Sequence, residues 1–127
     1  MCIKTRSAIF TATITLNLLA KFHMFQELVH YGIHLLVPGL IAWLFFRNNW
    51  RVAWIIMLST MLVDLDHLLA NPVFMSNRCS INFHPLHSYA AICVYVVMLL
   101  FKKVRIIAIG LILHMVADYS DCLWMSS

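Results

Sequence analysis

The sequence predicts an all-α fold, specifically an integral membrane bundle of four transmembrane helices. Hydrophobic residues make up 63% of the 127 residues and charged residues only 11%, whereas a soluble domain is closer to half apolar. The mean hydropathy is +0.87, and long apolar runs follow one another along the chain. Only three glycines and three prolines occur, so we expect one domain without a flexible linker.

Basic turns and a proline delimit the predicted spans. Arg47 and Arg51 close the first apolar run, Pro72 ends the second, and Lys102 and Lys103 separate the third from the fourth. Two tight turns of this kind predict paired helical hairpins. The four predicted spans are about 27–46, 52–70, 88–101 and 106–124.

Two segments fit this scheme less simply. The third span is short for a bilayer unless Pro85 and His87 belong to its first turn. Within residues 1–23, the stretch from Ser7 to Ala20 is apolar but rich in threonine and β-branched residues, and it is too short for a predicted span. We leave residues 1–23 as an N-terminal extension outside the predicted four-helix domain of residues 24–127, for which Met24 would be a natural start.

The basic turns also predict the topology. Basic loops favour the cytoplasmic side, and both basic turns lie on one side if four spans cross. Both termini and the loop 71–87 are then expected outside. Basic residues in small clusters beside apolar runs indicate headgroup contacts, so membrane lipids are the expected partners and nucleic acid is not. The oligomeric state is left open.

Histidines and acids gather in four short motifs, which hold six of the seven histidines and four of the five acidic residues. Each motif maps to the outer half of a predicted span or to the outer loop. Ionisable groups are costly in a bilayer and usually mark a functional site, so we expect one shared site in the outer leaflet. The members are His30 and His34; Asp64, Asp66 and His67; His84 and His87; and His114, Asp118 and Asp121.

Residue spacing on the helices favours metal binding. His30 with His34, and His114 with Asp118, are i,i+4 pairs that share a helix face, and each pair could hold one ion. Each motif alone also has a structural explanation, such as interfacial histidines. Together, at one depth, the motifs favour a metal site.

The second helix and the outer loop supply further donors. Asp64 and His67 form an i,i+3 pair, and Asp66 is turned to another face, toward a second ion or a ligand imidazole. His84 and His87 lie in a loop that can fold over the bundle. The predicted metal ligands are His30, His34, Asp64, His67, His87, His114 and Asp118, with Asp66 and His84 as catalytic groups.

These donors exceed what one ion uses, since an ion takes four to six. Either two ions bind, or one binds and the surplus supplies a general base and hydrogen-bond partners. Imidazole and carboxylate without thiolate suit zinc first, with manganese or iron as alternatives. Haem and a metal-free proton relay rank lower. Glu27 and Asp121 are expected as rim charges.

The cysteines offer a second prediction. No Cys-x-x-Cys motif occurs among the four cysteines, so a thiolate zinc site is not expected. Cys79 in the outer loop and Cys122 at the outer end of the fourth span share a compartment, where an oxidising environment would allow a disulfide. Two unrelated thiols are the alternative.

The order of these motifs resembles a bacterial family of membrane-bound metal-dependent hydrolases. Residues 27–125 also resemble a small uncharacterised family of four-span bacterial proteins with the segments HYGIHLLVPGL, DLDHLLA, NRCSINFHPLHS and HMVADYSDC. The resemblance implies a multi-pass protein of the bacterial inner membrane. This chain is shorter than the hydrolases, and its His84-Pro-Leu-His87 replaces an H-R-G-x-x-H word, which removes an arginine that would clamp phosphate.

The function expected from the resemblance and the donors is hydrolysis of a lipid-linked or membrane-proximal ester by a divalent metal. The alternative is a metal carrier or a metal-stabilised scaffold without catalysis. A carrier needs ligands across the whole membrane, and the inner half of this chain offers none. The substrate is left open.

Overall fold

The computed structural model describes residues 2–71, 73 and 78–125, with side chains from residue 13 onward. All regular structure in these ranges is helical, so the all-α prediction is confirmed. The elements are α1 (Cys2–Phe45), η1 (Arg47–Asn49), α2 (Trp50–Ser59), η2 (Thr60–Leu69), η3 (Pro85–His87), α3 (Tyr89–Met98) and α4 (Arg105–Met125).

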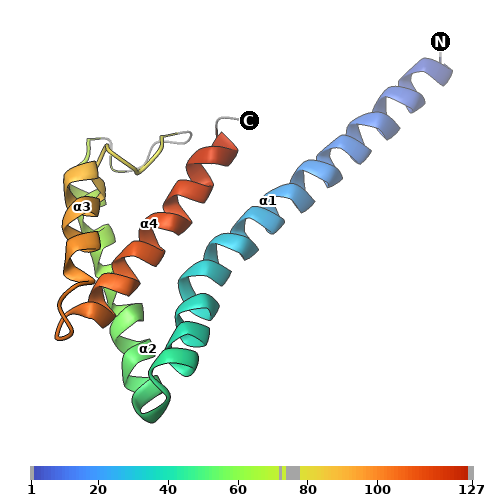
Figure 1. Ribbon diagram of the computed structural model, residues 1–127. Helices are drawn as coiled ribbons and strands as arrows, with labels where there is room; N and C mark the ends of the chain where they lie inside the picture. Colours follow the sequence, from blue (N-terminus) through green and yellow to red (C-terminus); the bar gives the residue numbers. More distant parts are fainter. Residues whose placement is uncertain (1, 72, 74–77, 126–127) are drawn as a thin grey trace.

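The helices form a small bundle from which the N-terminal part of α1 extends (Figure 1). α4 is central, because it packs against α1, α2 and α3. The turn at η1 and the turn between α3 and α4 lie toward one end (Figure 1). The loop after η2 and the C-terminal end of α4 lie at the other, which we call the loop end.

The first helix is longer than the predicted span at 27–46. α1 begins at Cys2, so no break separates residues 2–23 from the span. The reason is local: residues 2–31 contain neither glycine nor proline, the residues that most disfavour a helix interior. Further along α1, Pro38 lacks a backbone N–H. Nearby, the indole Nε1 of Trp54 donates a hydrogen bond of 3.0 Å to the carbonyl oxygen of Leu35.

The second predicted span, 52–70, is one continuous helical path that changes type. α2 ends at Ser59, and η2 continues as a 3₁₀ helix to Leu69. A 3₁₀ helix has three residues per turn, so side chains at i and i+3 lie above one another. Asp64 and His67 therefore lie on one face of η2, while Asp66 faces elsewhere.

The third helix is shorter than the predicted span at 88–101. Pro85 and His87 do not form its first turn, because Ser88 is extended (φ −71°, ψ 154°) and separates η3 from α3. The Oγ of Ser88 instead caps α3 by accepting a hydrogen bond of 3.2 Å from the N–H of Ala91. α4 agrees with the predicted span at 106–124 to within one residue at each end.

Three helices are long and apolar enough to cross a membrane, judged by length and composition: Thr13–Phe45, Arg47–Leu69 and Arg105–Met125. α3 has ten residues, about 15 Å at 1.5 Å per residue, against a bilayer core of about 30 Å. A fourth crossing therefore stays a prediction.

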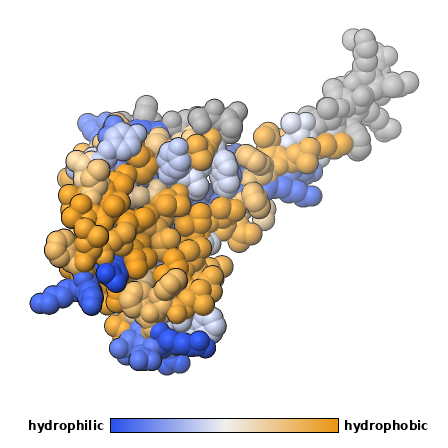
Figure 2. Space-filling view, in the orientation of Figure 1, coloured by the Kyte–Doolittle hydropathy of each residue, from blue (hydrophilic) through white to orange (hydrophobic). Residues whose placement is uncertain are grey.

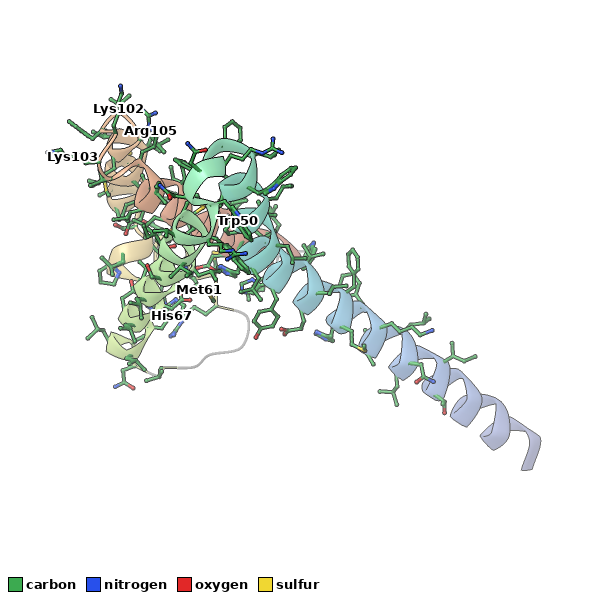
Figure 3. All side chains as sticks on the ribbon, turned by 90° about the horizontal axis from the view of Figure 1, so that it is seen from below. Trp50, Met61, His67, Lys102, Lys103 and Arg105 are labelled. Carbon is green, nitrogen blue, oxygen red and sulfur yellow. A yellow bond between two sulfur atoms is a disulfide. The ribbon has the colours of Figure 1, made fainter. Side chains whose placement is uncertain are left out.

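The surface agrees with a membrane protein. Hydrophobic residues cover most of the face seen in Figure 2, and hydrophilic residues lie mainly at its ends. In Figure 3, Lys102 and Lys103 extend from the turn between α3 and α4, away from the bundle. Leu, Ile, Val and Phe side chains are widely exposed on the helices, as expected where lipid is the solvent.

Two small apolar clusters hold the helices together. Ala42, Ala53 and Met57 form one between α1 and α2. Val63, Tyr95 and Met115 form the other, which lies nearer the loop end. Gly110 lets α4 approach α2 closely, because an added Cβ would lie 2.8 Å from the side chain of Thr60 and 2.9 Å from the Cα of Met57. This contact sets the position of α4 along α2.

Candidate metal centre

The buried side chains of the bundle include nearly as many polar groups as hydrophobic ones. Apart from Thr60, these polar groups are histidines and aspartates near the loop end, brought there by α1, η2, η3 and α4. Ionisable groups this deeply buried must be paired or bind a metal. They are His34, Asp66, His84, His87, His114 and Asp118.

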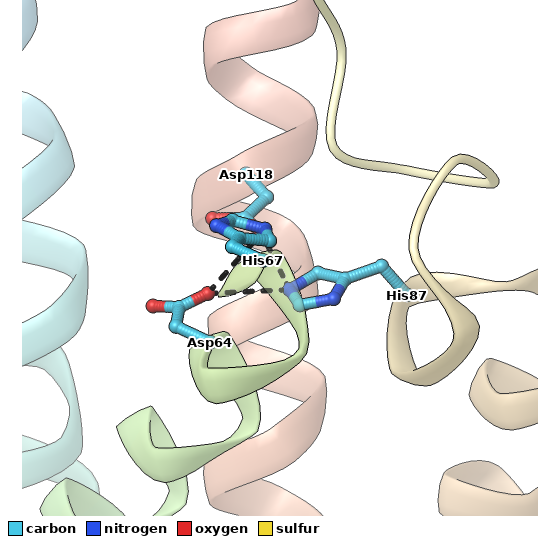
Figure 4. A group of neighbouring side chains, drawn as sticks. All are labelled: Asp64, His67, His87 and Asp118. Atoms are coloured by element: carbon cyan, nitrogen blue, oxygen red, sulfur yellow. Dashed lines mark ion pairs between the residues drawn. The ribbon is translucent and has the colours of Figure 1, made fainter. Parts of the chain in front are cut away.

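Four donor atoms converge at the centre of this group. The Nε2 atoms of His87 and His114 lie 3.3 Å apart. The Oδ1 of Asp64 lies 3.4 Å from the first of these nitrogens and 3.0 Å from the second. The Oδ2 of Asp118 lies 3.0 Å and 3.6 Å from the same two atoms. Figure 4 shows Asp64, His87 and Asp118 approaching from three different elements, together with His67.

These separations match the donor spacing around a metal ion. Four ligands at 2.0–2.1 Å from a tetrahedral ion are about 3.3 Å apart. The Oδ2 of Asp118 lies near His87 Nε2, yet it is buried and makes no hydrogen bond with the described residues. The two atoms are close without being aligned as donor and acceptor. His114 Nε2, in contrast, is within hydrogen-bond geometry of Asp64 Oδ1 at 3.0 Å and of His87 Nε2 at 3.3 Å. The four atoms therefore form one compact donor set in which Asp118 Oδ2 is left without a hydrogen bond.

Asp66 lies behind His87, on the side away from these four donor atoms. Its Oδ2 lies 3.2 Å from His87 Nδ1 and accepts a hydrogen bond of 2.8 Å from the N–H of Leu86. A hydrogen bond at Nδ1 leaves Nε2 with a free lone pair, the tautomer that a metal requires. The hydroxyl of Tyr95 donates a hydrogen bond of 2.9 Å to the carbonyl of Leu86, so α3 also holds η3 in place.

The electrostatics around His87 favour a positive charge. Burial lowers the pKa of its imidazole, but the neighbouring carboxylates of Asp118, Asp64 and Asp66 outweigh this effect and raise the pKa to about 10. The side chain of His87 is fully buried. The three carboxylates therefore stabilise a cation at this position, either a proton or a metal ion.

A second group of donors lies beside the first. The Nε2 of His67 is 3.8 Å from Asp64 Oδ1, and its ring lies 4.0 Å from that of His84, centroid to centroid. Asp66, His67 and His84 each place one donor atom within 4.8 Å of the others. Burial lowers the pKa of His84, and His67 lowers it further.

A third group lies between α1 and α4. The Nε2 of His34 is 3.9 Å from Asp118 Oδ1, and the His30 ring lies 4.5 Å from the His34 ring, centroid to centroid. His30, His34 and Asp118 each offer one donor atom within 4.8 Å of the others. Asp121, which we expected as a rim charge, lies with its Oδ2 2.7 Å from His30 Nδ1.

The predicted disulfide is present in the structure. Cys79 and Cys122 are bonded and join the loop to the end of α4, so the alternative of two unrelated thiols is wrong. The loop is further ordered by a hydrogen bond of 2.9 Å from the N–H of Asn82 to the carbonyl of His87. Asn82 adopts a left-handed φ of 62°, which asparagine tolerates better than most residues. These bonds hold η3 over the bundle.

Residues 24–125 match the model of a family of unknown function, DUF6122. The chain belongs to this family. The matched stretch contains every histidine and aspartate of the three donor groups. No curated protein and no solved structure matches the chain.

In this DUF6122 member, all nine predicted site residues lie near the loop end, in three adjacent donor groups rather than one. Sequence reasoning missed the part played by Tyr95. A tyrosine inside an apolar run could have indicated a buried hydroxyl that needs a partner. It also underestimated Asp121, although its i,i+3 spacing from Asp118 could have indicated a shared face.

Proposed function

We propose that this DUF6122 member is a membrane-embedded hydrolase that uses a divalent metal to cleave a lipid-linked or membrane-proximal ester. One observation carries the proposal. The Nε2 atoms of His87 and His114 each lie 3.0–3.6 Å from carboxylate oxygens of Asp64 and Asp118. Asp66 contacts the opposite nitrogen of the His87 ring and so orients that ring. A carboxylate, a histidine and a metal in this order are typical of protein metal sites.

The four central donors would hold the ion. His67 places one donor atom within 4.8 Å of those of Asp64, His87 and Asp118, so it would be available as a fifth. Two imidazoles and two carboxylates suit zinc first, with manganese or iron as alternatives. When bound, such an ion lowers the pKa of a water ligand and polarises the ester oxygen. The burial of His87 and His114 keeps bulk water from one side of the centre.

His84 and Asp66 have different places beside this centre. Hydrolysis joins a water oxygen to the acyl carbon or phosphorus of the ester and breaks the bond to the alcohol oxygen, which takes up a proton. His84, whose pKa is lowered by burial, would accept the proton that the water releases. Asp66 lies on the far side of His87 from the four donor atoms, so it would support the reaction by orienting His87.

The position of the donors supports a hydrolase over a carrier. No histidine, aspartate or glutamate occurs in residues 35–63 or 88–113, which include both turns at the end remote from the donors (Figure 1). An ion would find no further ligands along these residues. We propose that the loop end faces outward from the bacterial inner membrane, where lipids would reach it.

Lipid analysis of a deletion strain tests this function. We expect a lipid ester to accumulate in the deletion strain and in cells carrying Asp64→Asn. Wild-type protein and Cys93→Ser, which alters an exposed residue of α3 outside the three donor groups, should restore the lipid profile. No lipid change in the deletion strain, with metal still bound to the purified protein, would overturn the hydrolase and favour a metal-binding scaffold.

A further inference from the structure

We infer that the centre binds two metal ions, with Asp118 as the carboxylate that bridges them. This inference rests on the proposed function and specifies the form of its active site. The second ion would be held by His30 and His34 of α1 together with Asp118 of α4. The packing of α1 on α4 places His30 and His34 beside Asp118, on the side that faces away from His87.

The two oxygens of Asp118 face different donors. Its Oδ2 lies 3.0 Å from His87 Nε2 and 3.6 Å from His114 Nε2, whereas its Oδ1 lies 3.9 Å from His34 Nε2. Ligands at about 2.0–2.2 Å from one ion lie up to about 4.3 Å apart, so the last distance allows a shared ion. A bridging carboxylate is suited to ions about 3.5–4 Å apart.

Two buried atoms of the residues proposed for this ion, His30 Nδ1 and Asp118 Oδ2, make no hydrogen bond with the described residues. His34 is only 5% exposed, and the 3.9 Å from its Nε2 to Asp118 Oδ1 is too long for a hydrogen bond. Its ring lies between those of His30 and His114, with centroid distances of 4.5 Å and 4.6 Å. Buried polar groups are normally satisfied, and an ion beside Asp118 would satisfy this one.

The second ion would also have access to solvent and substrate. A cavity of about 360 Å³ opens at the loop end between α1 and α4, and His30, Asp121, Glu27 and Tyr31 are among its lining residues. His30 Nδ1 lies 2.7 Å from Asp121 Oδ2 but makes no aligned hydrogen bond. Three ligands of the first ion, His87, His114 and Asp118, are buried, and the side chain of the fourth, Asp64, is 39% exposed. The second ion would border the cavity, which gives substrate a route to it.

Metal stoichiometry tests the inference. Protein purified in lipid nanodiscs, stripped and reloaded with Mn²⁺, should carry about two ions per chain and give the electron paramagnetic resonance spectrum of a coupled pair. The variant combining His30→Gln and His34→Gln should carry one ion and give an uncoupled spectrum. His23→Gln, which alters another histidine of α1 that borders the cavity, should keep both ions.

The outcomes separate the two proposals. One ion per chain in wild type, unchanged in the double variant, would overturn the second site and leave the hydrolase proposal intact. Two ions that survive in the double variant would overturn the assignment to His30 and His34. No bound ion in wild type would overturn both. Formation of the Cys79–Cys122 disulfide and an unchanged elution volume would show that the variant folds.

Discussion

Nδ1 of His87 lies 3.2 Å from the carboxylate of Asp66, and this contact turns the opposite nitrogen of the ring toward His114, 3.3 Å away. Two imidazole nitrogens at this distance repel each other if both carry lone pairs or both carry protons. A cation between them, or a proton on one ring, removes the repulsion.

Replacing Asp66 should weaken metal binding without removing a ligand. Asp66→Asn keeps the size of the side chain but loses the charge that orients His87, and partners of this kind contribute roughly 10–100-fold to metal affinity. We expect a decrease of that order for zinc, measured by competition with a chromogenic chelator. Glu27→Gln is the control, and an unchanged affinity in Asp66→Asn would contradict the proposed arrangement.

Metal removal should destabilise the bundle. Without an ion, His34, His87, His114 and Asp118 remain buried without full compensation. Ligand binding at 100 times the dissociation constant stabilises a fold by about 2.7 kcal/mol. We expect chelated protein to unfold at a lower temperature and zinc to restore the original value, as measured by intrinsic fluorescence in nanodiscs. A metal-free protein of unchanged melting temperature would be evidence against the metal centre.

Two glycine substitutions should distinguish the effect of close packing on stability from the effect of helix propensity. Gly110→Ala places a methyl group against Thr60 and the backbone of Met57, so we expect a loss of roughly 1–3 kcal/mol from overpacking. Gly32→Ala is the matched control, because nothing lies within 4 Å of its added Cβ and alanine favours the helix by about 1 kcal/mol. Denaturant titration of both variants measures the difference, and equal effects would contradict the close approach of α4 to α2.

Loss of the disulfide should affect both stability and metal binding. The bridge between Cys79 and Cys122 closes a segment with a sequence separation of 43 residues, and a bridge of this type typically stabilises a fold by about 2–4 kcal/mol. A variant with serine at both positions should be less stable and bind zinc more weakly, because η3 carries His87. Cys93→Ser, at an exposed free cysteine, should leave both properties unchanged.

Much of the fold follows from local sequence. The basic turns at Arg47 and Lys102 separate helices close to where the structure ends them, because charged side chains and apolar runs define helix boundaries in lipid. The change from α2 to η2 was not predictable, since the apolar run continues without a glycine or proline through Thr60. The third helix begins at Tyr89, one residue after the start of the predicted span at 88–101, but its end at Met98 was not predicted.

The sequence by itself determined that the histidines and aspartates would lie near one end of an apolar helical chain, since depth along a helix follows from residue number. It also determined which pairs share a helix face, such as His30 with His34. Only the tertiary structure decided which donors meet across helices. That choice depends on the rotation and height of α4 against its neighbours, which Gly110 permits and the Cys79–Cys122 bridge secures. Asp66 therefore lies behind His87 while Asp118 lies between two groups of histidines, because packing between helices is a non-local property that residue spacing does not encode.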